Sequence, residues 1–195
     1  MDHSSITGVI LAGGRSSRMG EDKGLVEVQD KPLFEHIAQR LSPQVGDILI
    51  SCNQNAERYG RDFQTVPDII QSYSGPLAGM LAALTVSKTE WVVFVPCDVP
   101  GFPANLASTF LSRISNQQAI FARDPEREHP TLCMLNRSLI PTLTAYLENG
   151  DRKLMIFFNS ISADSVLFND ASAFSNLNTP EDVLRWQDSL KGLQQ

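Results

Sequence analysis

The sequence predicts an α/β protein with three layers, in which a mostly parallel sheet carries helices on both faces. Apolar stretches of strand length alternate with stretches of helix length along most of the chain. The continuously apolar stretch 91–95 (WVVFV) has the composition of a strand that is covered on both sides. The chain has 195 residues without a linker or repeat, so we expect a single domain over 1–195.

The first half of the chain shows the strand–helix rhythm most clearly. Residues 6–12 form an apolar strand that runs into two glycines. The helix expected at 32–41 begins with Pro32 and repeats apolar residues at helical spacing. The further elements expected in this half are strands at 47–52, 63–66, 91–95 and 118–123 and helices at 76–87 and 103–114.

The second half is less regular, and its last helix has the strongest start signal. Thr179 can cap this helix, Pro180 takes its first position, and two acidic residues follow in the first turn. The elements expected in this half are a strand at 129–135 and helices at 137–148, 152–158 and 178–190.

Composition excludes several broad classes of protein. The net charge of −6 argues against non-specific nucleic-acid binding, which needs a cationic surface. The three cysteines are far apart and form no CxxC pair, so we expect reduced thiols and a cytoplasmic protein. No run of about 18 apolar residues is present, and the beginning of the chain lacks the cationic start of a signal peptide.

The loop after the first expected strand is rich in glycine and in positive charge. Ligands of such sheets bind at the carboxyl ends of the strands, where this loop lies. Gly13 and Gly14 let the backbone approach an anion closely, and Arg15, Arg18 and Lys23 can pair with phosphate oxygens. The dinucleotide fingerprint and the P-loop are both absent. The alternative is a solvated loop with ordinary surface charge.

Several segments in the same order resemble nucleotidyltransferases that activate sugars, alditols and pterins, and among these the MobA-type molybdenum cofactor guanylyltransferases. The matching segments are LAGGRSSRMGEDKGLVEV (11–28), DKPLFEH (30–36), SGPLAGMLAAL (74–84), VPCDVPGFP (95–103), REHPT (127–131) and NLNTPED (176–182). The resemblance covers nearly the whole chain. It implies the three-layer, Rossmann-like nucleotidyltransferase fold.

The resemblance also implies an activity and a set of site residues. GMP would pass from GTP to the phosphate of molybdopterin with release of pyrophosphate. Lys23, Arg18 and Asp98 would be catalytic, with Mg²⁺ on Asp98. The nucleotide would be bound by Leu11, Ala12, Gly13, Gly14, Lys23, Ser51 or Asn53, Asp68, Gly75, Gly79 and Asp98, and molybdopterin by Asn176, Asn178 and Arg152.

The resemblance implies GTP and molybdopterin as substrates. It also implies transient contacts with other cofactor-biosynthesis proteins and with acceptor molybdoenzymes. We expect a monomer that binds neither nucleic acid nor membrane. Two other functions stay open. The chain could transfer cytidylyl or another nucleotidyl group to a pterin or sugar phosphate, or it could bind and deliver the cofactor without chemistry.

Most of the site residues also have a purely structural interpretation. Asp98 could stabilise a turn, Gly79 could serve tight helix–sheet packing, and Asp68 could be an exposed turn residue. Asn176 and Asn178 would share one face of an extended segment, but both could instead serve turns and caps. For Arg152 a solvated helix start is the alternative. His129 is expected in a structural or second-substrate role, and Phe157, Phe158 and Trp186 are expected in the core.

Overall fold

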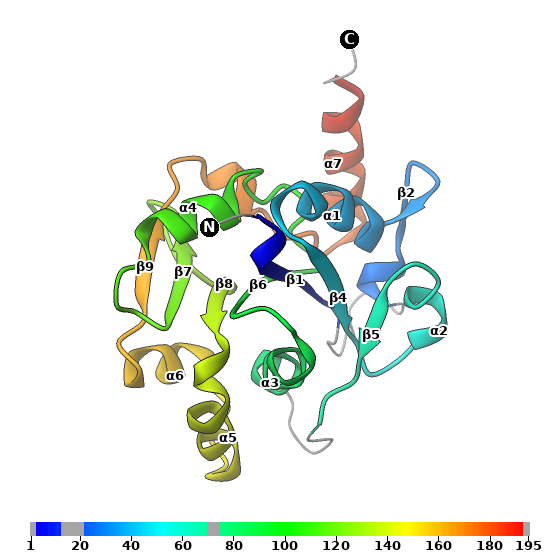
Figure 1. Ribbon diagram of the computed structural model, residues 1–195. Coiled ribbons are helices and arrows are strands. Elements are labelled where there is room, and N and C mark those ends of the chain that lie inside the picture. The colour runs from blue at the N-terminus through cyan, green and yellow to red at the C-terminus, as the bar shows by residue number, and fades with distance from the viewer. Residues whose placement is uncertain (1–2, 13–21, 70–74, 193–195) are drawn as a thin grey trace.

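The computed structural model describes residues 3–12, 22–69 and 75–192. They form a seven-stranded sheet with helices on both faces (Figure 1). The expected α/β class, the mostly parallel sheet and the layered arrangement are confirmed. In the described part of the chain, no helix is both long and apolar enough to span a bilayer.

The strands of the main sheet are β1 (Ile6–Leu11), β4 (Asp47–Ser51), β5 (Gln64–Val66), β6 (Trp91–Pro96), β7 (Ala119–Arg123), β8 (Glu128–Asn136) and β9 (Asp164–Leu167). Their spatial order is β5-β4-β1-β6-β8-β7-β9. Every pair is parallel except those that β8 forms with β6 and β7. A separate two-stranded hairpin consists of β2 (Glu27–Val28) and β3 (Lys31–Pro32).

The register brings the ends of the central strands together. Leu11, the last residue of β1, pairs with Ser51 of β4 on one side and with Pro96 of β6 on the other. Ser51 in turn pairs with Val66, the last residue of β5. Because these four strands are parallel, the loops that follow them all emerge at one edge of the sheet.

The α-helices are α1 (Leu33–Leu41), α2 (Ala56–Tyr59), α3 (Pro76–Val86), α4 (Leu106–Arg113), α5 (Ile140–Glu148), α6 (Leu154–Ser160) and α7 (Pro180–Gly192). Figure 1 shows α1 and α4 on one face of the sheet and α3, α5 and α6 on the other, with α7 extending away from the body. Short 3₁₀ helices are η1 (His3–Ser5), η2 (Lys23–Leu25), η3 (Ser42–Gln44), η4 (Arg137–Leu139) and η5 (Ala171–Phe174).

Each face of the sheet buries its own apolar cluster. Successive strand residues point to opposite faces, so Ile10 joins the cluster under α1 and α4 whereas Val9 joins the one under α3 and α5. The helix α3 is apolar on all sides and is almost wholly buried, which fits its position against the sheet and α5. Phe157 and Phe158 are fully buried in the second cluster, as expected, and Trp186 packs partly buried against the first.

Most expected elements are present, with shifted ends. The helix expected from residue 103 begins at Leu106, and the one expected from 152 begins at Leu154. Pro32 precedes α1 as its N-cap residue instead of lying inside the helix. The hairpin, α2 and β9 were not expected. The prediction of one domain over 1–195 stays a prediction.

Candidate functional site

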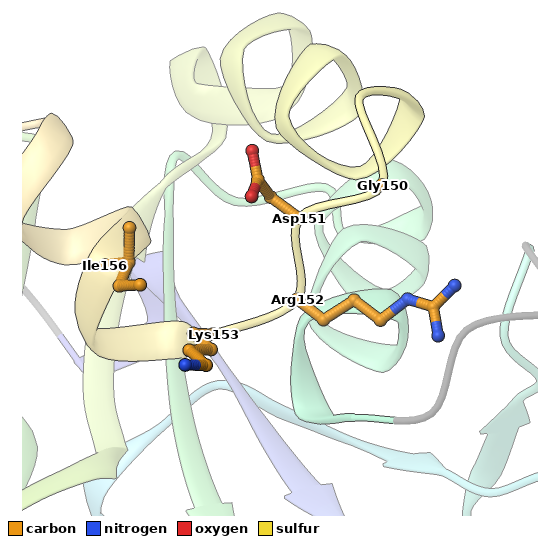
Figure 2. A pocket seen from close by; sticks show the side chains of 5 residues that line it. All are labelled: Gly150, Asp151, Arg152, Lys153 and Ile156. Carbon is orange, nitrogen blue, oxygen red and sulfur yellow. The ribbon is translucent and has the colours of Figure 1, made fainter.

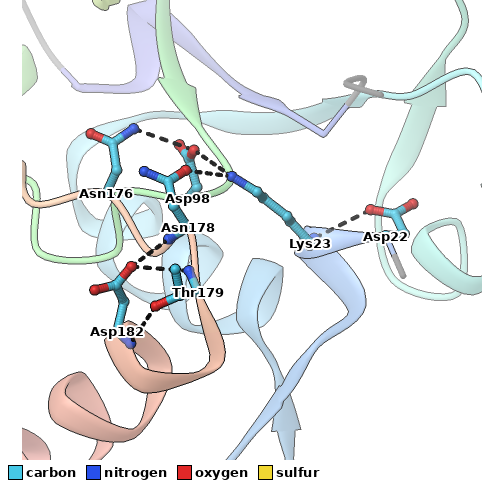
Figure 3. Close-up of polar contacts among 8 residues, drawn as sticks. Asp22, Lys23, Asp98, Asn176, Asn178, Thr179 and Asp182 are labelled. Carbon is cyan, nitrogen blue, oxygen red and sulfur yellow. Dashed lines mark hydrogen bonds and ion pairs between the residues drawn. The ribbon is translucent and has the colours of Figure 1, made fainter. Parts of the chain in front are cut away.

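Four polar side chains from distant parts of the chain meet at the carboxyl edge of the sheet. The Lys23 ammonium lies 3.3 Å from Oδ2 of Asp98 and donates to Oδ1 of Asn178 at 2.7 Å. The Asn176 amide donates to the same Asp98 oxygen at 3.3 Å. Figure 3 shows these side chains converging. The Lys23 and Asp98 side chains are only 21% and 17% exposed, so the ion pair is partly shielded from water. We call these four residues the polar cluster.

The end of β6 and the segment before α7 build the polar cluster together. Asp98 follows the last residue of β6 by two positions. Its carbonyl accepts a hydrogen bond of 2.8 Å from the backbone N–H of Leu177, and the Leu177 side chain is buried in the first core cluster. The two asparagines on either side of Leu177 both reach the cluster, as their spacing predicts.

The start of α7 fixes the second asparagine. The Asp182 carboxylate accepts from the backbone N–H groups of Asn178 and Thr179 at 3.0 and 2.9 Å. Thr179 Oγ1 accepts from the Asp182 N–H at 3.2 Å, which confirms Thr179 as the cap of this helix. These bonds, first among them that from the Asn178 backbone, lower the pKa of Asp182 and keep its carboxylate charged.

A second polar group lies beyond β4 and β5. The Asn53 amide donates to Asp68 Oδ2 at 2.8 Å and accepts from the Asp68 backbone N–H at 2.9 Å, and these contacts are exposed. Ser51 is buried instead, and its hydroxyl lies against α3, where a Cβ on Gly79 would come within 2.3 Å of Oγ and 3.1 Å of Asp68 Oδ1. Gly79 therefore permits close packing of α3, and Asn53 is the more accessible of the two candidates for base contact.

The carboxyl end of β1 lies between these two groups. Leu11 accepts from the backbone N–H of Cys97 at 3.1 Å, and Ala12 donates to the Ser51 carbonyl at 2.9 Å. Both residues are thus tied to the neighbouring strands on either side. The predicted site residues Gly13, Gly14 and Arg18 lie outside the described residues.

A basic surface cavity opens between α5 and α6. Its volume is about 370 Å³, and it is lined by Gly150, Asp151, Arg152, Lys153 and Ile156. Figure 2 shows the Asp151, Arg152 and Lys153 side chains pointing in different directions from one extended segment. The Arg152 carbonyl lies 3.7 Å from the position of a Cβ on Gly75, so Arg152 comes next to the start of α3. Gly75 has a φ of +150°, which favours glycine there.

His129 lies within the fold and has an acidic partner. Its Nε2 is 2.7 Å from Oδ2 of Asp124, both side chains are buried, and its ring stacks on Phe174 with centroids 4.4 Å apart. The hydrogen bond from His129 lowers the pKa of Asp124 to about 2. These contacts join the β7–β8 turn to η5, which favours a structural role for His129.

Raised pKa values make Cys52 and Cys97 poor nucleophiles. Desolvation raises the pKa of Cys97 to about 12, with a further contribution from the neighbouring Asp98 charge, and burial raises that of Cys52 to about 11. Both thiols are therefore protonated near neutral pH. The cysteines are free, as expected.

Sequence reasoning missed Asp22, Asn55 and Tyr59, whose side chains are joined by hydrogen bonds next to Lys23. Only Asp22 lies in a segment that the resemblance had marked. Tyr59 ends the short helix α2 and Asn55 is the N-cap residue before it, and this segment carries no sequence signal for a site.

The chain is similar to known proteins over nearly its whole length. A sequence profile of the MobA-like NTP transferase domain matches residues 8–164. The chain is 51% identical over 194 residues to a molybdenum cofactor guanylyltransferase of Serratia proteamaculans, with 98% of each chain covered. It is 49% identical over 191 residues to one of Yersinia pseudotuberculosis, covering 96% of this chain and 98% of that protein.

Solved structures show the same fold. The crystal structure of molybdopterin-guanine dinucleotide biosynthesis protein A from Archaeoglobus fulgidus superimposes with a TM-score of 0.80 at 20% identity, covering 95% of this chain and 99% of that one. A nucleotidyltransferase from Methanothermobacter thermautotrophicus gives 0.76 at 17% identity, covering 97% and 99%. Together with the profile match and the relatives at about half identity, this similarity shows that the chain belongs to the family of MobA-like nucleotidyltransferases.

Proposed function

We propose that this protein transfers the guanylyl group of GTP to the terminal phosphate of molybdopterin, giving molybdopterin guanine dinucleotide and pyrophosphate. The observation that carries the proposal is the polar cluster at the edge of a nucleotidyltransferase fold. The relatives named molybdenum cofactor guanylyltransferase, which match over nearly their full length, support the choice of substrates.

The chemistry needs positioning and charge neutralisation more than proton transfer. A phosphate oxygen of molybdopterin forms a bond to the α-phosphorus of GTP, while the bond from that phosphorus to the pyrophosphate oxygen breaks. The attacking phosphate is largely ionised at neutral pH, so no general base is required. Both reactants are anions, and Lys23 supplies positive charge where they meet. We propose Arg18 and the amides of Gly13 and Gly14 for the rest of the triphosphate.

The side-chain oxygens of Asp98 and the two asparagines are ligands of the kind that a magnesium ion takes. Mg²⁺ is usually bound by one or two carboxylates with phosphates and water, and Asp98 supplies one carboxylate beside the amide groups of two asparagines. Among the described residues no group of three or more histidine, cysteine or acidic side chains could enclose a metal without phosphate ligands. We propose that Asp98 holds Mg²⁺ with the substrate phosphates. When bound, the ion neutralises charge on the reacting phosphates.

The remaining contacts divide between the two substrates. We propose that the base and ribose of GTP lie over the ends of β1 and β4 and the start of α3, and that molybdopterin lies toward the segment before α7 and the cavity beside α5. The nucleotide contacts proposed are Leu11, Ala12, Ser51 or Asn53, Asp68, Gly75 and Gly79, and the molybdopterin contacts are Asn176, Asn178 and Arg152.

We further propose that the protein is a cytoplasmic monomer in a single nucleotidyltransferase domain, which meets other cofactor-biosynthesis proteins and acceptor molybdoenzymes transiently. The net charge of −6 supports the absence of nucleic-acid partners.

A transfer assay tests the proposed function. Purified protein is incubated with Mg²⁺, molybdopterin and one nucleoside triphosphate at a time, and pyrophosphate and the dinucleotide product are measured. We expect product with GTP and little with CTP. Product with CTP alone would establish a cytidylyltransferase instead. GTP binding without any pyrophosphate release would favour a delivery protein.

A further inference from the structure

We infer that Tyr59 and Asn55 act as positioning residues, which hold Asp22 so that the Lys23 ammonium is presented at the reacting phosphates. We call Asp22, Asn55 and Tyr59 the Asp22 clamp. The inference rests on the proposed function for the identity of the phosphates. It assigns a role in transfer to α2 and its N-cap residue, which among the described residues form no hydrogen bond with the polar cluster.

The Asp22 carboxylate is bound by three neutral donors. Oδ1 accepts from the Tyr59 hydroxyl at 2.6 Å and from the Gly24 backbone N–H at 3.2 Å. Oδ2 accepts from the Asn55 amide at 3.0 Å. Asp22 is also the N-cap of η2, whose first residue is Lys23. Both oxygens are thus used in attaching the Lys23 backbone to α2.

Tyr59, which donates one of these hydrogen bonds, is held firmly in the core. Tyr59 has no exposed surface, and its ring packs edge-on against Phe34 with centroids 4.9 Å apart. Burial, followed by the hydrogen bond to Asp22, raises the pKa of Tyr59 far above its ordinary value. The phenol therefore stays protonated and donates to Asp22 across the working pH range.

The fit between η2 and α2 requires glycine at residue 24. A Cβ on Gly24 would lie 2.4 Å from the Tyr59 hydroxyl oxygen, well inside contact distance. The backbone that carries Lys23 therefore rests directly on the phenol, and it cannot move toward α2. It is held back from moving away by the bonds to Asp22.

The clamp also separates two neighbouring charges. Asp22 is adjacent to Lys23 in sequence, yet the ion pair of Lys23 is with Asp98 and the oxygens of Asp22 are bound by Tyr59, Asn55 and Gly24. The lysine charge is thereby directed toward the polar cluster. Because displacement of a reacting group by about 1 Å can cost 100-fold in rate, loosening the clamp should slow transfer.

Two variants remove the clamp bonds with little change of shape. Tyr59→Phe deletes only the hydroxyl. Asn55→Gly deletes the amide at a residue whose φ is +54°, a conformation that glycine adopts without strain. The matched control is Thr7→Val, which also removes a buried hydroxyl, here one that bonds Thr89 at 2.8 Å at the amino end of β1, away from the site.

We expect Tyr59→Phe to lower kcat/KM for GTP about tenfold, since one charge-assisted hydrogen bond is lost. Thr7→Val should lose a similar amount of stability and keep its kcat/KM. The decisive measurement is a double-mutant cycle with Lys23→Ala. If Tyr59 acts through Lys23, then Tyr59→Phe changes the residual rate of the Lys23→Ala variant by less than about twofold.

Amide hydrogen exchange gives a readout that does not depend on turnover. Exchange in the peptide spanning residues 22–26 should quicken in Tyr59→Phe and in Asn55→Gly, and the peptide spanning β6 should be unchanged. Multiplicative effects in the cycle, or unchanged exchange at 22–26 in both variants, would overturn the inference. Absence of guanylyl transfer by the wild type, with the exchange changes still present, would refute the proposed function alone and leave the clamp on Lys23 standing.

Discussion

At the scale of single residues, Asp98 has the clearest dual task. Its carbonyl holds the Leu177 backbone and its carboxylate meets Lys23 and Asn176. The backbone contact would survive a change of the side chain. Structure and proposed chemistry can therefore be separated at this position by substitution.

The first prediction concerns Asp98→Asn. The amide keeps the shape of the side chain but loses the charge proposed to bind Mg²⁺, so we expect kcat to fall by about 100-fold or more. Pyrophosphate release at several Mg²⁺ concentrations measures the effect, and thermal unfolding should be nearly unchanged. The control is Asp47→Asn, at the exposed amino end of β4. Full activity in Asp98→Asn would remove Asp98 from the metal site.

Gly79 lets the helix α3 approach the sheet closely, because glycine has no Cβ at this position. In an exposed helix, replacing glycine with alanine stabilises by up to about 1 kcal/mol. Here the added Cβ would lie 2.3 Å from Ser51 Oγ. We predict that Gly79→Ala lowers the free energy of unfolding by about 1–3 kcal/mol, as overpacking does.

Urea denaturation measures this effect, and a second substitution identifies its cause. Ser51→Ala removes the oxygen that the new methyl group would meet, so the double variant should recover most of the lost stability. If the double variant is as unstable as Gly79→Ala alone, contact with Ser51 is not the cause.

At the scale of elements, the sequence predicted those strands and helices that have a repeating or continuous apolar pattern. Six of the seven strands of the main sheet and most helices were located within a few residues, because burial on one or both faces gives them a period or a continuous apolar run. The hairpin of β2 and β3 has two residues in each strand, too few to show any period. The antiparallel direction of β8 was not predicted either, since the apolar pattern of a strand does not depend on its direction.

The turn between β7 and β8 supports an element-scale prediction about pH. The folded pKa of Asp124 is about 2, below its ordinary 3.8, so its charged form stabilises the fold. This contribution is complete above about pH 5 and is lost as the pH falls toward 2. The free energy of unfolding should therefore be larger for wild type than for Asp124→Asn at pH 7, and the difference between the two should become smaller below about pH 4.

Urea midpoints measured from pH 7 to pH 3 test this prediction. Asp170→Asn is the control, because Asp170 likewise accepts backbone hydrogen bonds and has a lowered pKa, but it has no histidine partner. A constant gap between wild type and Asp124→Asn over the whole range would show that the pair with His129 does not stabilise the fold.

At the scale of the whole molecule, the polar cluster joins segments that are 75 and 155 residues apart. The resemblance marked Lys23, Asp98 and the two asparagines separately. Lys23 and Asp98 lie in segments that follow strands, which predicted that these two would meet at one edge of the sheet. The Asp22 clamp could not be foreseen, because Asn55 and Tyr59 follow a different strand, β4, from the one that Asp22 follows. It depends on a packing contact between a glycine and a buried phenol that no local pattern encodes.

The last prediction concerns the attachment of the segment before α7 to this cluster. Leu177 is 5% exposed and lies between Asn176 and Asn178, so its burial sets where both amides point. Leu177→Ala should cost about 2–5 kcal/mol of stability. It should also raise the KM for molybdopterin, because the segment that carries both asparagines loses its anchor in the core.

The comparison that isolates this effect is Val183→Ala, which shortens a side chain buried in the same apolar cluster but three residues inside α7. Both variants are assayed at a temperature where circular dichroism shows them folded. Leu177→Ala should change the KM for molybdopterin more than Val183→Ala at matched stability. The reason for this difference is that, of the two residues, only Leu177 is joined through its backbone to Asp98. Equal changes in the KM for molybdopterin would mean that general loosening of the core, and not the position of the two asparagine side chains, governs binding of the second substrate.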